Sequence, residues 1–363
     1  MREYFMRRLF SIPLVLLICG CADLDYYWHS ANGHMALMDQ RVDIEDLLAD
    51  EQLDDKLRAR LLLVQQIREF SIATLDLPAN GSYRNYVELQ QAYVIQNLFA
   101  APEFSTRLHQ WCYPLIGCAS YRGYYEEARL LADIDELQSE GLEVYVGEVP
   151  AYSTLGWFDD PVLSSFIDWP DYRLAGLMFH ELTHQRLYVD DDTTFNESLA
   201  SAVQQAGTVL WLESRNEAAQ LQEYMRWLVY RDEVIALIER TRERLRELYD
   251  SELGDAGKRE GKALQFDRAR AEHELIAERH DINGGYRSWF AGELNNARIG
   301  SVATYNARVP AFLNMLDDGA RNFTKFYRYV EKVAQLERSE REHCLDAWQR
   351  QPQSPAGSCP LPE

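Results

Sequence analysis

Two histidines and a glutamate in the segment HELTH, residues 180–184, have the types and the spacing of a metal-binding hydrolytic site. Apolar residues around this segment recur every three or four positions, which predicts a helix. On a helix, His180 and His184 would share one face, and their imidazoles could converge on one cation. Glu181 would be turned by about 100° around the axis, near the ion but not bound to it.

Zinc is the ion that this set of residues favours. Catalytic zinc sites use three protein ligands and leave a further position to water. The ion lowers the pKa of that water to about 7, so that it becomes a nucleophile at neutral pH. A carboxylate in reach, here Glu181, can take the proton of the water and pass it to a leaving amine. We therefore expect a zinc-dependent enzyme that hydrolyses peptide bonds.

Glu197 is the candidate for the third ligand. It lies in the segment TFNESLA (194–200), where a helical pattern resumes after the acidic turn DDDTT (190–194). A second helix that folds back would bring this carboxylate against the histidine helix. The segment also matches a capping box, in which Glu197 would instead bind the backbone N–H of Thr194. Both roles stay open at this point, and we expect the ligand role.

Helical patterns dominate the rest of the chain. We expect one or two helices between residues 43 and 74, a helical stretch over about 86–99, and a strand within 141–161. Two long charged helices around the turn GDAG (254–257) predict an inserted hairpin arm over about 215–281, which is either a solvated surface or a partner-binding one. These elements predict a mainly α fold with a small β-sheet (α+β), in which residues 21–363 form a single domain.

The N-terminal residues have the pattern of a targeting segment. Arg7 and Arg8 precede the apolar run LFSIPLVLLI (9–18), which is too short to stay as a membrane-spanning helix. The following ICGC (18–21) resembles the bacterial lipobox, so residues 1–20 would be a signal peptide and Cys21 the lipidated N-terminus. An ordinary secretory signal and a retained anchor are the alternatives. We expect a periplasm-facing lipoprotein of the cell envelope, and Ala22 favours the outer membrane over the inner.

The net charge and the cysteines indicate which partners and which cross-links to expect. The formal net charge of −21, from 37 Lys and Arg against 58 Asp and Glu, repels phosphate backbones, so we expect no nucleic-acid partner. Four cysteines remain after the signal segment and Cys21 are set aside: Cys112, Cys118, Cys344 and Cys359. In an exported chain they predict two disulfides, and turn residues between near neighbours favour the pairs Cys112–Cys118 and Cys344–Cys359. A zinc site built from all four is the alternative.

The segment HELTHQRLYVDDDTTFNESLA (180–200) resembles a family of predicted zinc aminopeptidases from Gram-negative bacteria, within the wider gluzincin metallopeptidases. The likeness covers most of the mature chain, including WCYPLIGCASYRGYY (111–125), AYSTLGWFDDPVLS (151–164) and NNARIGSVATYN (295–306). The resemblance implies His180, His184 and Glu197 as zinc ligands and Glu181 as general base. It also implies a zincin-like pair of active-site helices and a small sheet whose edge strand aligns the peptide substrate.

One position departs from the gluzincin pattern. Those enzymes often carry an Asp four residues after the ligand glutamate, where it holds the free nitrogen of a ligand histidine. Here that position is Ser201. An aspartate of the acidic turn at 190–192 could supply this outer carboxylate instead.

Further roles are assigned from chemistry alone. Tyr305 is our candidate donor to an oxyanion, with Tyr286 behind it and a packing role as the alternative. The backbone of five residues is expected to pair with an extended peptide by strand addition: Ser153, Thr154, Leu155, Gly156 and Trp157. An aminopeptidase also needs a carboxylate for the substrate ammonium. Asp159, Asp160 and Glu293 are equally open candidates.

Two functions of different classes follow from these features. The first is a zinc peptidase, ranked as an aminopeptidase above an endopeptidase by the family label alone. The alternative is a non-catalytic envelope lipoprotein scaffold that binds zinc structurally or not at all. The sequence leaves the oligomeric state and the preferred substrate side chain open.

Overall fold

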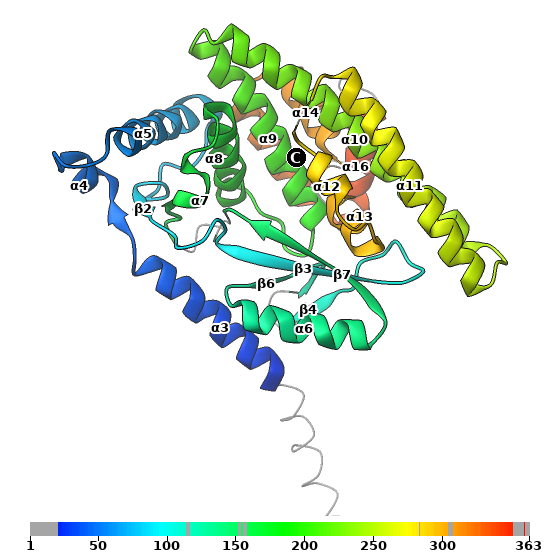
Figure 1. Cartoon of the computed structure of the whole chain (residues 1–363). Coiled ribbons are helices and arrows are strands. Elements are labelled where there is room, and N and C mark those ends of the chain that lie inside the picture. Colours follow the sequence, from blue (N-terminus) through cyan, green and yellow to red (C-terminus); the bar gives the residue numbers. More distant parts are fainter. Residues whose placement is uncertain are drawn as a thin grey trace, which may run out of the picture.

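Helices form most of the described chain, and small sheets of two or three strands complete it (Figure 1). The computed structural model describes residues 21–113, 117–151, 154, 158–282, 284–303, 308–350 and 359. The expected mainly α class with a small β component is confirmed, and so is the long helical hairpin. No described helix combines the length and the apolar character needed to span a bilayer.

The N-terminal part alternates helices with short strands. α3 (Cys21–Met38) leads to α4 (Ile44–Ala49) and α5 (Asp55–Leu75), in agreement with the helices expected between residues 43 and 74. β1 (Val42–Asp43), β2 (Asn85–Val87) and β8 (Val162–Leu163) form one sheet in the order β1-β2-β8. β4 (Trp111–Tyr113) and β5 (Gly117–Ala119) pair antiparallel, and the Cys112–Cys118 disulfide joins them.

The largest strands belong to the sheet β6-β3-β7, in which β3 (Ile95–Pro102) pairs antiparallel with β6 (Arg122–Tyr124) and with β7 (Leu142–Val149). Side chains of β3 alternate between two apolar layers. Leu98 and Ala100 pack with α6 (Glu127–Ser139), whereas Phe99 and Ala101 pack with α13 (Asn296–Ala303). The helix expected over about 86–99 is therefore wrong. A short apolar run does not distinguish strand from helix by its period, and pairing with two distant segments decides here.

The centre of the molecule is a pair of neighbouring helices. α7 (Ser164–Ile167) leads into α8 (Asp171–Arg186), which packs against α9 (Thr193–Ser214) above the β3-β7 pair in the view of Figure 1. Glycine permits their close approach, because a Cβ on Gly207 of α9 would lie 2.9 Å from the Phe179 ring of α8. α8 carries the HELTH segment and α9 carries Glu197.

The hairpin arm consists of α10 (Ala218–Asp250) and α11 (Asp255–Arg279), which share an apolar core of their own. Lys262 of α11 attaches the arm to the sheet. This lysine is buried, and its ammonium bonds the Glu143 carboxylate of β7 and, at 2.8 Å, the backbone oxygen of Glu103. The short helix α12 (Arg287–Ala291) follows the arm.

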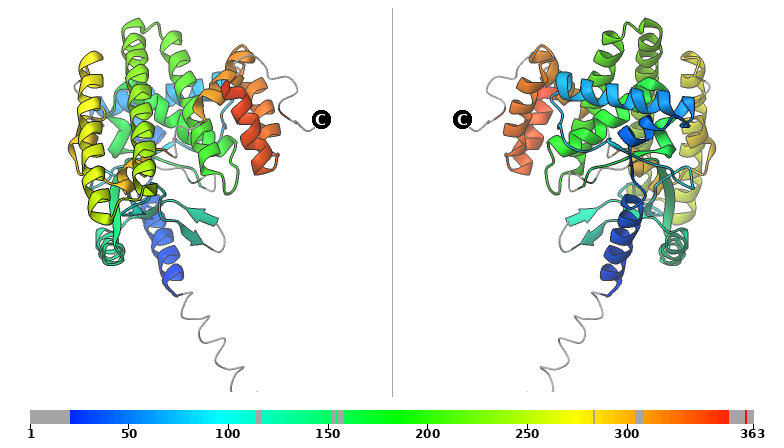
Figure 2. Two further views of the ribbon diagram at one scale, coloured as in Figure 1. Left: turned by 90° about the vertical axis from the view of Figure 1, so that its right-hand side faces the viewer. Right: turned by 90° about the vertical axis from the view of Figure 1, so that its left-hand side faces the viewer.

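The C-terminal helices lie on the side of α9 opposite the arm (Figure 2). They are α14 (Val309–Asp318), α15 (Phe323–Ala334) and α16 (Arg338–Arg350). A disulfide joins Cys344 of α16 to Cys359 of the tail. Both expected disulfides are therefore confirmed, and the alternative zinc site of four cysteines is wrong.

Candidate metal centre

α8 presents the two histidines of HELTH together. The helix begins at Asp171, directly after Pro170, whose fixed φ suits a helix start. Buried apolar residues of the same helix, among them Leu174 and Met178, fix its orientation in the core. The ring centroids of His180 and His184 are 5.0 Å apart.

Asp192 caps the N-terminus of α9. Its carboxylate accepts the backbone N–H of Phe195 at 3.1 Å and binds the Arg341 guanidinium of α16 at 2.8 Å. Asn196 accepts the N–H of Val189 and donates to the carbonyl of the same residue, both at 2.8 Å, which fixes the connection 187–192 between the helices. The cap is thus not Thr194. The capping box that was the alternative for Glu197 is wrong.

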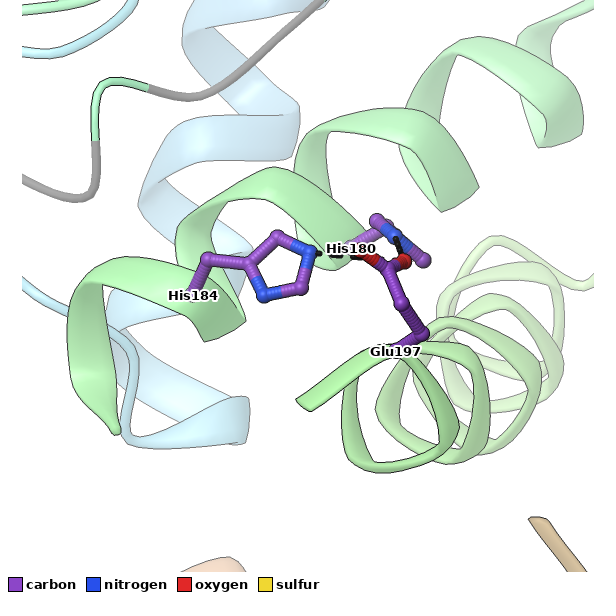
Figure 3. A group of neighbouring side chains, drawn as sticks. All are labelled: His180, His184 and Glu197. Atoms are coloured by element: carbon purple, nitrogen blue, oxygen red, sulfur yellow. Dashed lines mark hydrogen bonds and ion pairs between the residues drawn. The ribbon is translucent and has the colours of Figure 1, made fainter. Parts of the chain in front are cut away.

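The Glu197 carboxylate points instead to the two histidines (Figure 3). Its Oε2 lies 3.3 Å from Nε2 of His180 and 3.8 Å from Nε2 of His184. One ligand atom from each of the three residues falls within 4.8 Å of the others, so this group can hold a metal ion. The donors fit such an ion. Unprotonated imidazole nitrogens and a carboxylate oxygen all present lone pairs to the same space, and a cation there would be attracted by each of them.

Gln204 orients His180 from α9. Its side-chain oxygen lies 3.1 Å from Nδ1 of His180, and because an amide oxygen only accepts, Nδ1 is assigned the hydrogen. Nε2 is then the nitrogen that is available to a metal. Gln204 takes the place that we expected for an aspartate at 190–192. The signal was present in the sequence, since Gln204 follows Glu197 by seven residues and therefore shares its face of the helix.

The two histidines differ in their electrostatic surroundings. Burial, with a contribution from His180, lowers the pKa of His184 to about 4, so this imidazole is neutral at pH 7, the form that binds metals. Burial also lowers the pKa of His180, but the hydrogen bond to Glu197 and nearby negative charge outweigh it, and the pKa is raised. Nδ1 of His184 is buried and has no hydrogen-bond partner among the described residues.

Glu181 is a buried acid beside the histidines, with 8% of its surface exposed. Burial raises its pKa to about 7. His180 opposes this shift, whereas the negative charges of Glu197 and Asp160 add to it. An acid with this pKa can accept and return a proton near neutral pH, as the expected general base must.

Asp160 connects the expected substrate segment to α8. Its carboxylate accepts the Thr154 backbone N–H at 3.2 Å and the Gln185 side-chain N–H at 2.7 Å. Because Asp160 is 3% exposed and already bonded, it does not offer a free carboxylate to a substrate ammonium. Asp159 and Glu293 stay candidates for that role. Several expected site residues lie outside the described residues: Ser153, Leu155, Gly156, Trp157 and Tyr305.

The charges of the two acids influence two tyrosines that we did not expect. Burial raises the pKa of Tyr121, and the charge of Glu197 adds to the shift. Burial also raises the pKa of Tyr83, with a contribution from Glu181. Both phenols are therefore neutral hydrogen-bond donors at pH 7. They come from segments far upstream of HELTH, so no local pattern pointed to them. Tyr286, in contrast, packs against the apolar core of the arm.

The fold and the site define a helical protein in which an HExxH helix and a glutamate from the next helix form a group able to hold a metal ion. A family model described as "Putative aminopeptidase" matches residues 25–345, and the chain belongs to this family. This membership supports a peptidase-type enzyme. Neither the comparison with curated proteins nor that with solved structures gave a match.

Proposed function

We propose that this protein is a zinc-dependent aminopeptidase with His180, His184 and Glu197 as its metal ligands. The observation that carries the proposal is the convergence of these three donors, from two adjacent helices, next to a buried acid. Two imidazole nitrogens and one carboxylate oxygen are a ligand set found in catalytic zinc sites. The preference for a free substrate N-terminus rests on the family description alone.

Zinc bound here would polarise the scissile carbonyl and lower the pKa of a water molecule. Residues of the chain supply the remaining functions. Glu181, with a pKa of about 7, takes the proton of the attacking water and returns it to the leaving amine. Gln204 keeps Nε2 of His180 directed toward Glu197. Tyr121, whose phenol stays neutral at pH 7, is a second candidate donor to the developing oxyanion beside Tyr305.

The substrate would be aligned by the segment around Thr154. In this proposal, an extended peptide pairs with the backbone of residues 153–157 by strand addition. Asp160 is then a positioning residue, because it bonds Thr154 on one side and Gln185, the neighbour of His184, on the other. Its hydrogen bonds hold Thr154 next to the histidine helix.

A comparison of matched glutamate variants tests the catalytic proposal. Bound metal and hydrolysis of amino-acyl amides and internal peptides are measured for the wild type, Glu181→Gln and Glu260→Gln, an exposed residue of the arm. We expect zinc in all three and a loss of at least about 100-fold in kcat for Glu181→Gln only. Equal hydrolysis by Glu181→Gln would reject the general base. Zinc without hydrolysis in any of them would favour the scaffold function.

We also propose that Cys21 is lipidated and holds the protein in the cell envelope, at the outer membrane. The support is the lipobox-like sequence before it. In cell fractionation, the wild type should be found with the membranes. Cys21→Ser should leave them, because charge alone would not retain a chain with a net charge of −21. Unchanged membrane association of Cys21→Ser would contradict the lipid anchor.

A further inference from the structure

A cavity of about 130 Å³ lies between α8 and the start of α10. Four aromatic side chains form much of its wall, from the residues before α8, from α8 itself and from α10: Trp169, Tyr172, Tyr224 and Trp227. Three of them form a chain of ring contacts, since the ring centroids of Tyr172 and Tyr224 are 5.6 Å apart and those of Tyr224 and Trp227 are 6.0 Å apart. Leu177 and Gln204 complete the side that faces the metal centre.

The cavity is linked to the ligand histidines through Gln204 and through Leu177, which lies one helical turn before His180. Leu177 precedes His180 by three residues, so the two are neighbours on one face of α8, with Cβ atoms about 5–6 Å apart. Gln204 is shared by both sites, because it lines the cavity and its oxygen also binds Nδ1 of His180. A peptide whose scissile bond lies at the metal therefore has this cavity within reach of an adjacent side chain.

The size and the lining select the kind of group that fits. A cavity of about 150 Å³ with apolar walls binds one benzene molecule, so 130 Å³ suits one aromatic ring or one branched aliphatic side chain. The aromatic walls offer edge and face contacts to such a group. A drug-sized ligand needs about 300 Å³ or more and would not fit.

The charge at the cavity disfavours basic side chains. Among the described residues that line it, Arg173 is the one ionised group, and its guanidinium lies 4.5 Å from the centroid of the Trp169 ring. The described lining includes no carboxylate. A lysine or arginine side chain of a substrate would therefore enter next to a like charge, and the carboxylate beside the lining, Glu223, is already hydrogen-bonded to Tyr172.

We infer that this cavity is the specificity pocket for a large apolar side chain, aromatic or branched aliphatic, next to the scissile bond of the peptide. The inference rests on the proposed peptidase function. It assigns the substrate class that the family description leaves open. Leu177, which lines the pocket one helical turn before His180, would then determine the substrate specificity.

Two substitutions of leucine by tryptophan test the pocket by activity. Leu177→Trp fills the cavity, and Leu264→Trp places the same side chain on an exposed position of the arm, where Leu264 is 62% exposed. Two series of peptides are compared, one with the residue before the scissile bond varied and one with the residue after it varied. In one of the two series, the wild type should prefer Phe or Leu over Ala and Lys. Leu177→Trp should lower the kcat/KM ratio of Phe to Ala by about 10-fold to 200-fold, and Leu264→Trp should leave it unchanged.

A binding measurement separates failure of the pocket from failure of the peptidase. Calorimetry measures the binding of phenylalanine amide and of alanine amide to two proteins. One is the Glu181→Gln variant, and the other carries both Glu181→Gln and Leu177→Trp. We expect phenylalanine amide to bind at least about tenfold more tightly, and the double variant to lose this difference. If Leu177→Trp hydrolyses peptides with the side-chain preference of the wild type, and phenylalanine amide does not bind more tightly than alanine amide, the pocket is overturned while the peptidase function stands. Selective binding without any hydrolysis would keep the pocket and reject the peptidase.

Discussion

The hydrogen bond between Gln204 and His180 gives a prediction about metal affinity that does not depend on catalysis. Gln204→Met keeps the length of the side chain and removes the acceptor for Nδ1, so the ring loses the contact that selects its tautomer. The contact is a neutral hydrogen bond of 3.1 Å to a histidine side chain that is 14% exposed. Such a bond contributes about 0.5–1.5 kcal/mol, which corresponds to a factor of about 2–10 in affinity. We therefore expect zinc to bind up to about tenfold more weakly.

Gln204→Glu should act in the opposite direction. A carboxylate accepts more strongly than an amide and raises the basicity of the ligand, so zinc should bind more tightly than to the wild type. Both variants are measured by competition with a chromophoric chelator at about pH 7.5. Gln138→Met, at an exposed position of α6, is the control. Glu197→Gln removes one of the three proposed ligands and shows how far the zinc affinity falls when the site itself is broken.

The order of affinities is the decisive result. Zinc should bind most tightly to Gln204→Glu, less tightly to the wild type and more weakly still to Gln204→Met. If both variants bind zinc as the wild type does, while Glu197→Gln does not, the metal site stands and the orienting role of Gln204 is refuted. If Glu197→Gln also binds normally, the three-residue site itself is refuted.

Three further predictions concern stability. In metal-free protein, the Glu181 pKa is raised from 4.5 to about 7, so its ionisation lowers the stability of the fold as the pH rises between these two values. Glu181→Gln should then change urea stability little at about pH 4 and raise it by up to about 3 kcal/mol at about pH 8, and a pH-independent difference would contradict the shift. Asp160→Asn should lower the free energy of unfolding in urea by about 1.5–3 kcal/mol, because the charged acceptor for the Thr154 N–H, the Thr154 hydroxyl and the Gln185 amide is lost, and an unchanged value would contradict this positioning role. Cys359→Ser opens a loop of sequence separation 15 and should cost about 3 kcal/mol in thermal unfolding, whereas an unchanged midpoint would mean that the tail adds no stability.

Local patterns predicted much of the architecture and the centre of the site. HELTH places His180 and His184 on one face by helix geometry alone, and the spacing of Glu197 in a resumed helical pattern places it on the next helix. The hairpin arm and the two local disulfides were likewise readable, because the partners are close in sequence and separated by turn residues. In each case, the interaction is determined within a short stretch of chain.

Interactions between distant segments were not predictable in the same way. Ile95–Pro102 is a strand because β6 and β7 pair with it, and its own residues do not require that. The cap of α9 is Asp192 rather than Thr194, and its second bond, to Arg341, joins residues 149 positions apart in the chain. Asp160 was one of three unranked candidates for binding the substrate ammonium. Its partners, Thr154 and Gln185, lie on both sides of it in the chain, and only the tertiary fold brings them together.

The connection 187–192 has a practical consequence for handling the metal. Asn196 and Asp192 fix the two helices relative to each other through bonds that do not involve the ligand atoms. The binding geometry is therefore built by the polypeptide, unlike that of small zinc domains that fold only with their ion. Chelation should leave a folded protein that can be reloaded with cobalt, and the visible absorption of cobalt would then report on the coordination.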